Sequence, residues 1–91
     1  MGKAQWADLG MFVQSLMLVA CEYGLATCAQ LSWSVWYRQV SDYLQLDENE
    51  MLFCGMALGY ADKTHPVNQL RTDRAELDEV LAIKTKVNGD I

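Results

Sequence analysis

The chain has 91 residues, so it can form one small domain at most. It is 52% hydrophobic and 21% charged, with a single proline, and this profile argues against a disordered chain, since disordered chains are depleted in apolar and aromatic residues. A formal net charge of −5 argues against a nucleic-acid-binding protein, which usually carries a basic surface. So short a chain has little interior for its apolar surface, and we expect a partner subunit to cover part of it.

Residues 4–23 are predicted to form one long helix, and Gly24 is the natural residue to end it. The stretch 9–21 is apolar on nearly every side, and a helix of this kind is normally buried on every side. A membrane span would need about 18 or more uninterrupted apolar residues, and polar side chains interrupt this stretch. We therefore expect a helix inside a bundle or at a subunit interface, with no membrane partner. Gly10 within it predicts the close approach of another backbone.

The next segment, residues 26–32, is predicted to be a short irregular connection. A second helix is expected from Ser32 or Ser34, whose hydroxyl would accept a backbone N–H as the N-cap, to about Leu46. Its apolar residues recur at helical spacing and predict one buried stripe, made up of Trp33, Trp36, Tyr37, Val40, Tyr43 and Leu44.

The apolar run of residues 51–60 is short and bounded by turn residues, so it predicts a buried strand in which Gly55 allows a bulge or close packing. Residues 61–75 have the composition of a loop. Residues 80–87 predict an extended arm or edge strand, with the continuation of a short helix from near Glu76 as the alternative. Residues 88–91 are expected to be a frayed end.

The three cysteines, Cys21, Cys28 and Cys54, have no C-x-x-C spacing, and the chain has one histidine. A zinc site needs four close ligands, which this set does not offer. We expect reduced thiols that act as small buried hydrophobic side chains, in a cytoplasmic protein. The N-terminal residues lack the apolar core of a signal peptide, which fits that location.

Three segments in this order resemble the C-terminal half of the nitroreductase family of flavoproteins: residues 6–27, 51–61 and 65–79. The most specific part is Gly-Tyr at 59–60, followed by Pro-Val-Asn-x-x-Arg-Thr-x-Arg at 66–74. The resemblance covers roughly residues 6–80. It implies an α+β, mostly helical fold in a single half-domain, residues 1–91, with a core at 4–60 and a loop and C-terminal arm at 61–91. We expect two main helices, a short buried strand and the arm, completed by self-association.

The resemblance also implies an FMN-dependent oxidoreductase that passes electrons from NAD(P)H to nitroaromatic or quinone acceptors. Such enzymes are obligate dimers with FMN at the subunit interface, so the implied partners are a second copy of the chain and a nitroreductase N-terminal half. No catalytic side chain is implied, because the flavin does the chemistry. The residues implied to hold FMN are Ala29, Gln30, Leu31 and Ser32 beside the ring, through their backbone N–H groups, and Arg71 and Arg74 at the phosphate.

Two departures from the family pattern stand out. Glu76 replaces a proline that is common after the second arginine, and the family's N-terminal Arg-x-Ser-x-Arg motif is absent from this sequence. Three hypotheses therefore stay open. The chain is a self-associating half-domain that is not catalytic alone, or part of a functional flavin reductase completed by a separate N-terminal half, or a small interaction module without enzymatic activity.

Overall fold

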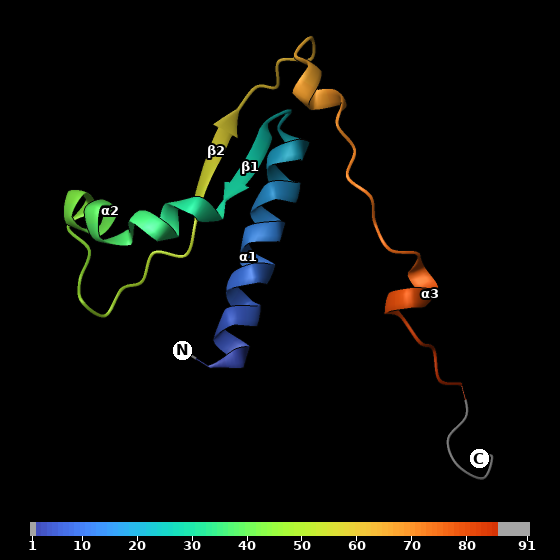
Figure 1. Ribbon diagram of the computed structural model, residues 1–91, viewed down its shortest axis with the longest axis horizontal. Coiled ribbons are helices and arrows are strands. Elements are labelled where there is room, and N and C mark those ends of the chain that lie inside the picture. Colours follow the sequence, from blue (N-terminus) through green and yellow to red (C-terminus); the bar gives the residue numbers. More distant parts are fainter. Residues whose placement is uncertain (1, 86–91) are drawn as a thin grey trace.

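The computed structural model describes residues 2–85 as a helix packed beside a small sheet, with an extended arm leading away (Figure 1). The elements in chain order are α1 (Lys3–Glu22), β1 (Ala26–Gln30), the 3₁₀ helix η1 (Leu31–Trp36), α2 (Tyr37–Leu44), β2 (Gly55–Gly59), the 3₁₀ helix η2 (Pro66–Gln69) and α3 (Leu77–Val80). The molecule extends over 60 × 42 × 24 Å. Helices therefore dominate, and one antiparallel sheet accompanies them, which agrees with the expected α+β class.

Helix α1 begins and ends within a residue of its predicted bounds. At its C-terminal end Gly24 has a φ of +74°, which only glycine adopts without strain. The amide of Leu25 donates to the carbonyl oxygen of Ala20 at 2.9 Å, so a carbonyl group left free by the end of the helix is satisfied. The predicted role of Gly24 as the helix stop is confirmed.

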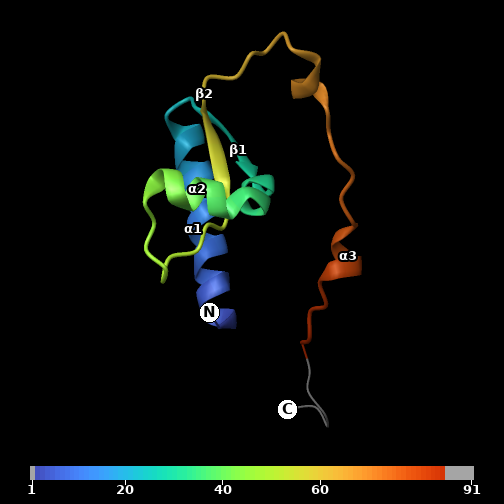
Figure 2. The same ribbon diagram turned by 60° about the vertical axis from the view of Figure 1, so that its left-hand side comes forward.

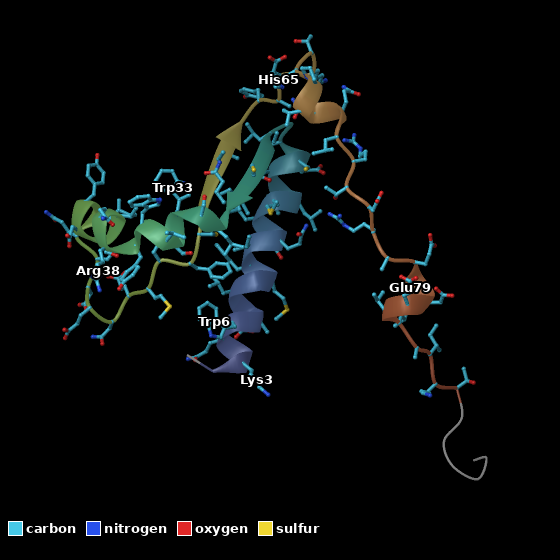
Figure 3. The ribbon with its side chains drawn as sticks, in the orientation of Figure 1. Lys3, Trp6, Trp33, Arg38, His65 and Glu79 are labelled. Atoms are coloured by element: carbon cyan, nitrogen blue, oxygen red, sulfur yellow. The ribbon has the colours of Figure 1, made fainter. Side chains whose placement is uncertain are left out.

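The predicted burial of α1 on every side is wrong for this chain. Within residues 2–85 Ala20 alone is buried, at 6% exposure, whereas Phe12 is 66% exposed and Leu18 is 62% exposed. Strand β1 packs along one side of the helix, and the Trp6 ring lies 5.6 Å from the Phe53 ring (Figure 3). Among residues 2–85, no further helix or strand covers the other sides of α1.

Two further expectations about α1 need comment. A Cβ added at Gly10 would meet no atom of the chain within 4 Å, so the close backbone approach predicted there does not occur within the described chain. By length and composition alone α1 could also cross a membrane, with a mean hydropathy of 1.2, a property shared by the core helices of soluble proteins.

Strands β1 and β2 pair antiparallel, from Ala26 opposite Gly59 to Gln30 opposite Gly55. The irregular connection predicted for residues 26–32 is therefore wrong. Strand β1 consists mostly of small residues, and it becomes a strand because β2 supplies a hydrogen-bonding partner. Strand β2 is shorter than the predicted 51–60, and it is not buried, since Ala57 and Leu58 are exposed.

The second helix starts as the 3₁₀ helix η1 and continues as α2. The predicted serine N-cap is wrong, because the Ser34 hydroxyl donates to the carbonyl oxygen of Leu31 at 2.7 Å instead of accepting an N–H. Helix α2 ends where Gln45 takes a left-handed φ of +56°. The predicted apolar stripe exists but is not buried: five of its six residues line an open groove of about 450 Å³ together with Gln39, namely Trp33, Trp36, Val40, Tyr43 and Leu44.

The cysteines also differ from expectation. Cys21 and Cys28 are exposed, and Cys54 is half-buried, so the prediction of buried thiols is wrong for this chain. The cause is the same as for α1, because a helix and two strands leave one face of each element uncovered.

Residues 61–85 form the arm, which runs away from the sheet in both views (Figures 1 and 2). The loop prediction for residues 61–75 holds apart from the short η2. Helix α3 follows Glu76 but ends at Val80, so the alternative of a helix that continues into residues 80–87 is not found as far as residue 85, and residues 81–85 have no regular secondary structure. The predicted arm at 80–87 is described in part, and the frayed end at 88–91 lies outside the described residues.

Candidate functional site

The β1–η1 junction holds the four residues expected beside the flavin ring. Ala29 and Gln30 are the last residues of β1, and Leu31 and Ser32 are the first of η1, so this segment is an ordered corner and not a loop. Amides at the start of a helix have no partner within that helix, which leaves N–H donors at the corner. The corner therefore offers backbone N–H groups, which can donate hydrogen bonds to the edge of a flavin ring.

A tryptophan three residues along from Gln30 packs against this corner. The Trp33 indole Nε1 donates to Gln30 Oε1 at 2.8 Å, and the Trp33 side chain rises from the helix that follows β1 (Figure 3). A Cβ built on Gly55 would lie 2.4 Å from Trp33 Cδ1. The close packing predicted at Gly55 is thus present, with the indole ring as the neighbour. In a 3₁₀ helix residues i and i+3 lie on one side, which is the signal that could have joined Gln30 to Trp33.

The two arginines expected at the FMN phosphate lie on the arm between η2 and α3. Arg71 Nη1 donates to the carbonyl oxygens of Leu70 at 2.9 Å and Asn68 at 3.2 Å. Arg74 Nη1 donates to the carbonyl oxygen of Asp73 at 2.9 Å and to the Thr72 hydroxyl. Both side chains are exposed, and the hydrogen bonds described for them go to uncharged oxygens, so both keep the charge and donor capacity that a phosphate needs.

The turn that precedes these arginines is held by side chains. The Asp62 carboxylate accepts hydrogen bonds from the amide and the hydroxyl of Thr64, at 3.0 and 2.7 Å. The hydroxyl bond is the main cause of a pKa at Asp62 below its ordinary value. His65 Nδ1 accepts the amide N–H of Val67 at 3.1 Å, so this histidine caps the start of η2.

The donor types fit FMN at both places, with backbone amides at the corner and guanidinium groups on the arm. The structure does not bring the two groups together in one chain, because the arm leaves the sheet on the side away from η1 and α2 (Figures 1 and 2). The assignment of these six residues to FMN thus stays a prediction.

The comparisons with known proteins agree with one another. The sequence profile of the Nitroreductase family matches residues 1–60. The 4-nitrobenzoate reductase of Pseudomonas putida is 46% identical over 72 residues, which are 79% of this chain and 32% of that protein. The chain spans about a third of the length of the curated relatives it matches.

Solved structures give the same answer. The FMN- and NADPH-dependent nitroreductase NfnB from Sphigopyxis sp. strain HMH matches with a TM-score of 0.88 and 44% identity, over 92% of this chain and 38% of that one. The FMN-dependent nitroreductase NfnB from Mycobacterium smegmatis, solved with NADPH, matches with a TM-score of 0.80 and 36% identity, over 86% of this chain and 35% of that one.

The fold of this chain therefore matches part of the fold of FMN-dependent nitroreductases. The chain belongs to the nitroreductase family. The resemblance drawn from residues 6–80 is confirmed, and so is FMN as the cofactor of this family. Because α1 lies within the matched residues, it is an element of the family's domain.

Proposed function

We propose that this chain supplies the C-terminal part of an FMN-dependent nitroreductase, self-associates through α1, and is not catalytic as an isolated chain. The observation that carries the proposal is the match to FMN-dependent nitroreductases over nearly the whole chain, combined with coverage of only about a third of those proteins. FMN, when bound, takes up a hydride from NAD(P)H and passes electrons to a nitroaromatic or quinone acceptor. The task of this chain is then to bind FMN and to orient its ring.

Each part of the chain has a separate task in this proposal. The corner residues Ala29–Ser32 donate backbone N–H groups to the edge of the flavin ring and polarise it. Arg71 and Arg74 hold the phosphate through their planar guanidinium groups. The two sets come from different parts of the fold, so residues of two subunits can each contribute one set to a shared site. The chain acts as one unit in the cytoplasm, with a core at 4–60 and an arm at 61–91.

Self-association is supported by the apolar surface of α1. Contiguous exposed apolar patches larger than a few hundred Å² are rare on monomeric proteins and mark interaction sites. The exposed side chains of α1 include Met11, Phe12, Leu16, Leu18 and Val19. A two-fold dimer is the commonest way to cover such a surface. A functional FMN reductase formed with a separate N-terminal half would use the same α1 surface and the same FMN-binding residues as the self-associated chain.

The test is an FMN titration, followed by flavin fluorescence quenching, on samples whose mass is fixed by light scattering. The chain alone is expected to be oligomeric and to oxidise no NADPH in the presence of a nitroaromatic. Mixed with the N-terminal part of a related nitroreductase, it is expected to bind FMN and become active. NADPH oxidation by the chain alone would contradict the first claim, and a mixture that stays colourless would contradict the second.

A matched pair of variants tests the phosphate role. Arg74→Ala is expected to weaken FMN binding by the mixture about tenfold or more, since a charge-assisted hydrogen bond contributes about 1.5–3 kcal/mol. Arg38→Ala is the control, because this exposed arginine contacts its neighbour Tyr37 on α2 and lies outside the proposed site (Figure 3). Equal affinities of the two variants would contradict the assignment of Arg74.

A further inference from the structure

The last residue pair of the sheet, Gln30 with Gly55, packs against the first turn of η1. Gln30 is paired with Gly55 across the ladder, and Trp33 follows Gln30 by one 3₁₀ turn. The indole N–H of Trp33 reaches the side-chain oxygen of Gln30 at 2.8 Å. Three residues from two strands and a helix thus meet where β1 turns into η1.

Gly55 is required for this contact because of space. Its added Cβ would lie 2.4 Å from Cδ1, 2.8 Å from Nε1 and 3.1 Å from Cγ of the Trp33 ring. Separations below about 3 Å are sterically forbidden, since carbon atoms pack at about 3.5–4.0 Å. Any side chain at position 55 therefore requires the Trp33 ring or the backbone beneath it to shift, and we expect this shift to disturb the contact of Trp33 with Gln30.

The indole also fixes the orientation of the Gln30 amide. An indole N–H only donates hydrogen bonds, so the oxygen and not the nitrogen of the Gln30 side chain must face it. The two N–H donors of that amide are then left for other acceptors. The same bond holds the first turn of η1, with the amides of Leu31 and Ser32, against the end of the sheet.

We propose that Trp33 is a positioning residue for FMN: held in the space above Gly55, it orients Gln30 and fixes the β1–η1 corner whose N–H groups meet the flavin ring. The inference rests on the proposed function, because it concerns the same FMN site. Trp33 needs no contact with FMN for this role, since it acts through Gln30 and the corner backbone.

The first experiment needs no flavin. Solvent exchange of the indole N–H protons is measured by NMR on the 91-residue chain, with Trp36 on the same 3₁₀ helix as the internal reference. Exchange at Trp33 is expected to be about tenfold slower than at Trp36, as a hydrogen bond of about 1.4 kcal/mol gives. Gln30→Leu and Gly55→Ala are each expected to abolish the difference, and Gln30→Glu, which keeps an acceptor oxygen, to retain it. Equal exchange at both tryptophans in the unmodified chain would overturn the proposal.

The second experiment measures FMN affinity in the mixture with the nitroreductase N-terminal part. Trp33→Phe is expected to weaken FMN binding about fivefold to tenfold, because one hydrogen bond that orders the corner is lost. Trp36→Phe removes an N–H from the same helix and is expected to change the affinity by less than about twofold. Equal affinities of these two variants would overturn the role of Trp33 and leave the proposed function standing. No FMN binding by the unmodified mixture would overturn the proposed function itself, and with it the role of Trp33 toward FMN.

A double-variant cycle separates positioning from a general loss of folding. Gly55→Ala alone is expected to weaken FMN binding as much as Trp33→Phe does, because it displaces the ring. In a Trp33→Ala background the ring is gone, and the further change Gly55→Ala is expected to have less than about twofold effect. Equal effects of Gly55→Ala in both backgrounds would show that position 55 acts without Trp33, which would overturn the proposal.

Discussion

At the residue scale, Asp62 shows how one side chain orders the start of the arm. Its carboxylate accepts two hydrogen bonds from Thr64, and its carbonyl oxygen accepts a third from the Asn68 side-chain amide. These hydrogen bonds are exposed to solvent, so each contributes little to the stability of the fold, but together they define the turn that leads into η2.

The lowered pKa of Asp62 predicts a pH-dependent turn. A carboxyl group with a folded pKa below its unfolded value, about 3.9, stabilises the turn above that pH, and the stabilisation is lost as the pH falls through the folded pKa. In an NMR titration the Thr64 amide is expected to shift with a midpoint below about 3.9. Thr64→Val, which removes the hydroxyl donor, should raise that midpoint, and Thr64→Ser should leave it low. An unchanged midpoint in Thr64→Val would assign the shift to another cause.

A second residue-scale prediction compares two glycines of the same region. Gly24→Ala places a Cβ on a backbone with a φ of +74° and is expected to destabilise the chain by about 1 kcal/mol. The Cβ of Gly10→Ala meets no atom within 4 Å other than the neighbouring backbone of α1 itself, so the change is expected to stabilise the helix by up to about 1 kcal/mol. Thermal unfolding followed by circular dichroism measures both changes. A stabilising Gly24→Ala would contradict the left-handed conformation at the end of α1.

At the element scale, α1 shows which parts of the fold were predictable. Its bounds depend on local signals, namely a continuous apolar stretch and Gly24, and these can be read from the sequence. Strand β1 was missed because its small residues carry no alternating pattern, and its partner lies beyond α2. Burial was overestimated throughout, since an apolar sequence indicates which faces need cover without indicating that this chain supplies it.

The candidate site was predictable to a similar extent. The motif at residues 59–74 led to Arg71 and Arg74. The comparisons confirm the family that the motif indicated, whereas the role of the two arginines stays a prediction. The spacing of Gln30 and Trp33 could have indicated their contact, whereas the packing of Trp33 on Gly55 could not be predicted, because it needs the β1–β2 register. That register depends on pairing between residues far apart in the sequence.

The exposed face of α1 gives an element-scale prediction. Leu18→Glu places a charge on a position that is 62% exposed in this chain and is expected to lie in the interface, so it should convert the oligomer to monomer. Gln39→Glu adds the same charge at an exposed polar position of α2, outside the proposed interface, and is the control. Light scattering at several concentrations measures the mass. An oligomer that survives Leu18→Glu unchanged would place the interface elsewhere.

At the scale of the whole molecule, the arm is the part that packs least against the rest of the described chain. All of residues 60–85 are exposed, and η2 and α3 are the only regular segments between β2 and residue 85. An arm of this kind gains its order from what it lies against, and in the proposed function that is FMN and a second polypeptide. Order in the arm is therefore coupled to assembly.

Limited trypsin digestion tests this coupling. In the chain alone, cleavage after Arg71 and Arg74 is expected to be faster than after Arg38, because α2 must open locally before Arg38 can be cut. In the FMN-bound mixture, cleavage after Arg71 and Arg74 is expected to slow by about tenfold or more, while cleavage after Arg38 provides the reference. Mass spectrometry of the fragments gives the rates. Equal cleavage with and without FMN would argue that the arm takes no part in the site.

The register of the sheet also determines the order in which the chain can fold. The innermost pair joins Gln30 to Gly55, so η1, α2 and the following turn must all be enclosed before the first rung can form. Closing a loop of this length costs conformational entropy before any backbone hydrogen bond between β1 and β2 can form. Helix α1 needs only its own neighbours and the stop at Gly24, so it can form as the chain leaves the ribosome. We therefore expect the apolar surface of α1 to be exposed for association before the β1–η1 corner is completed.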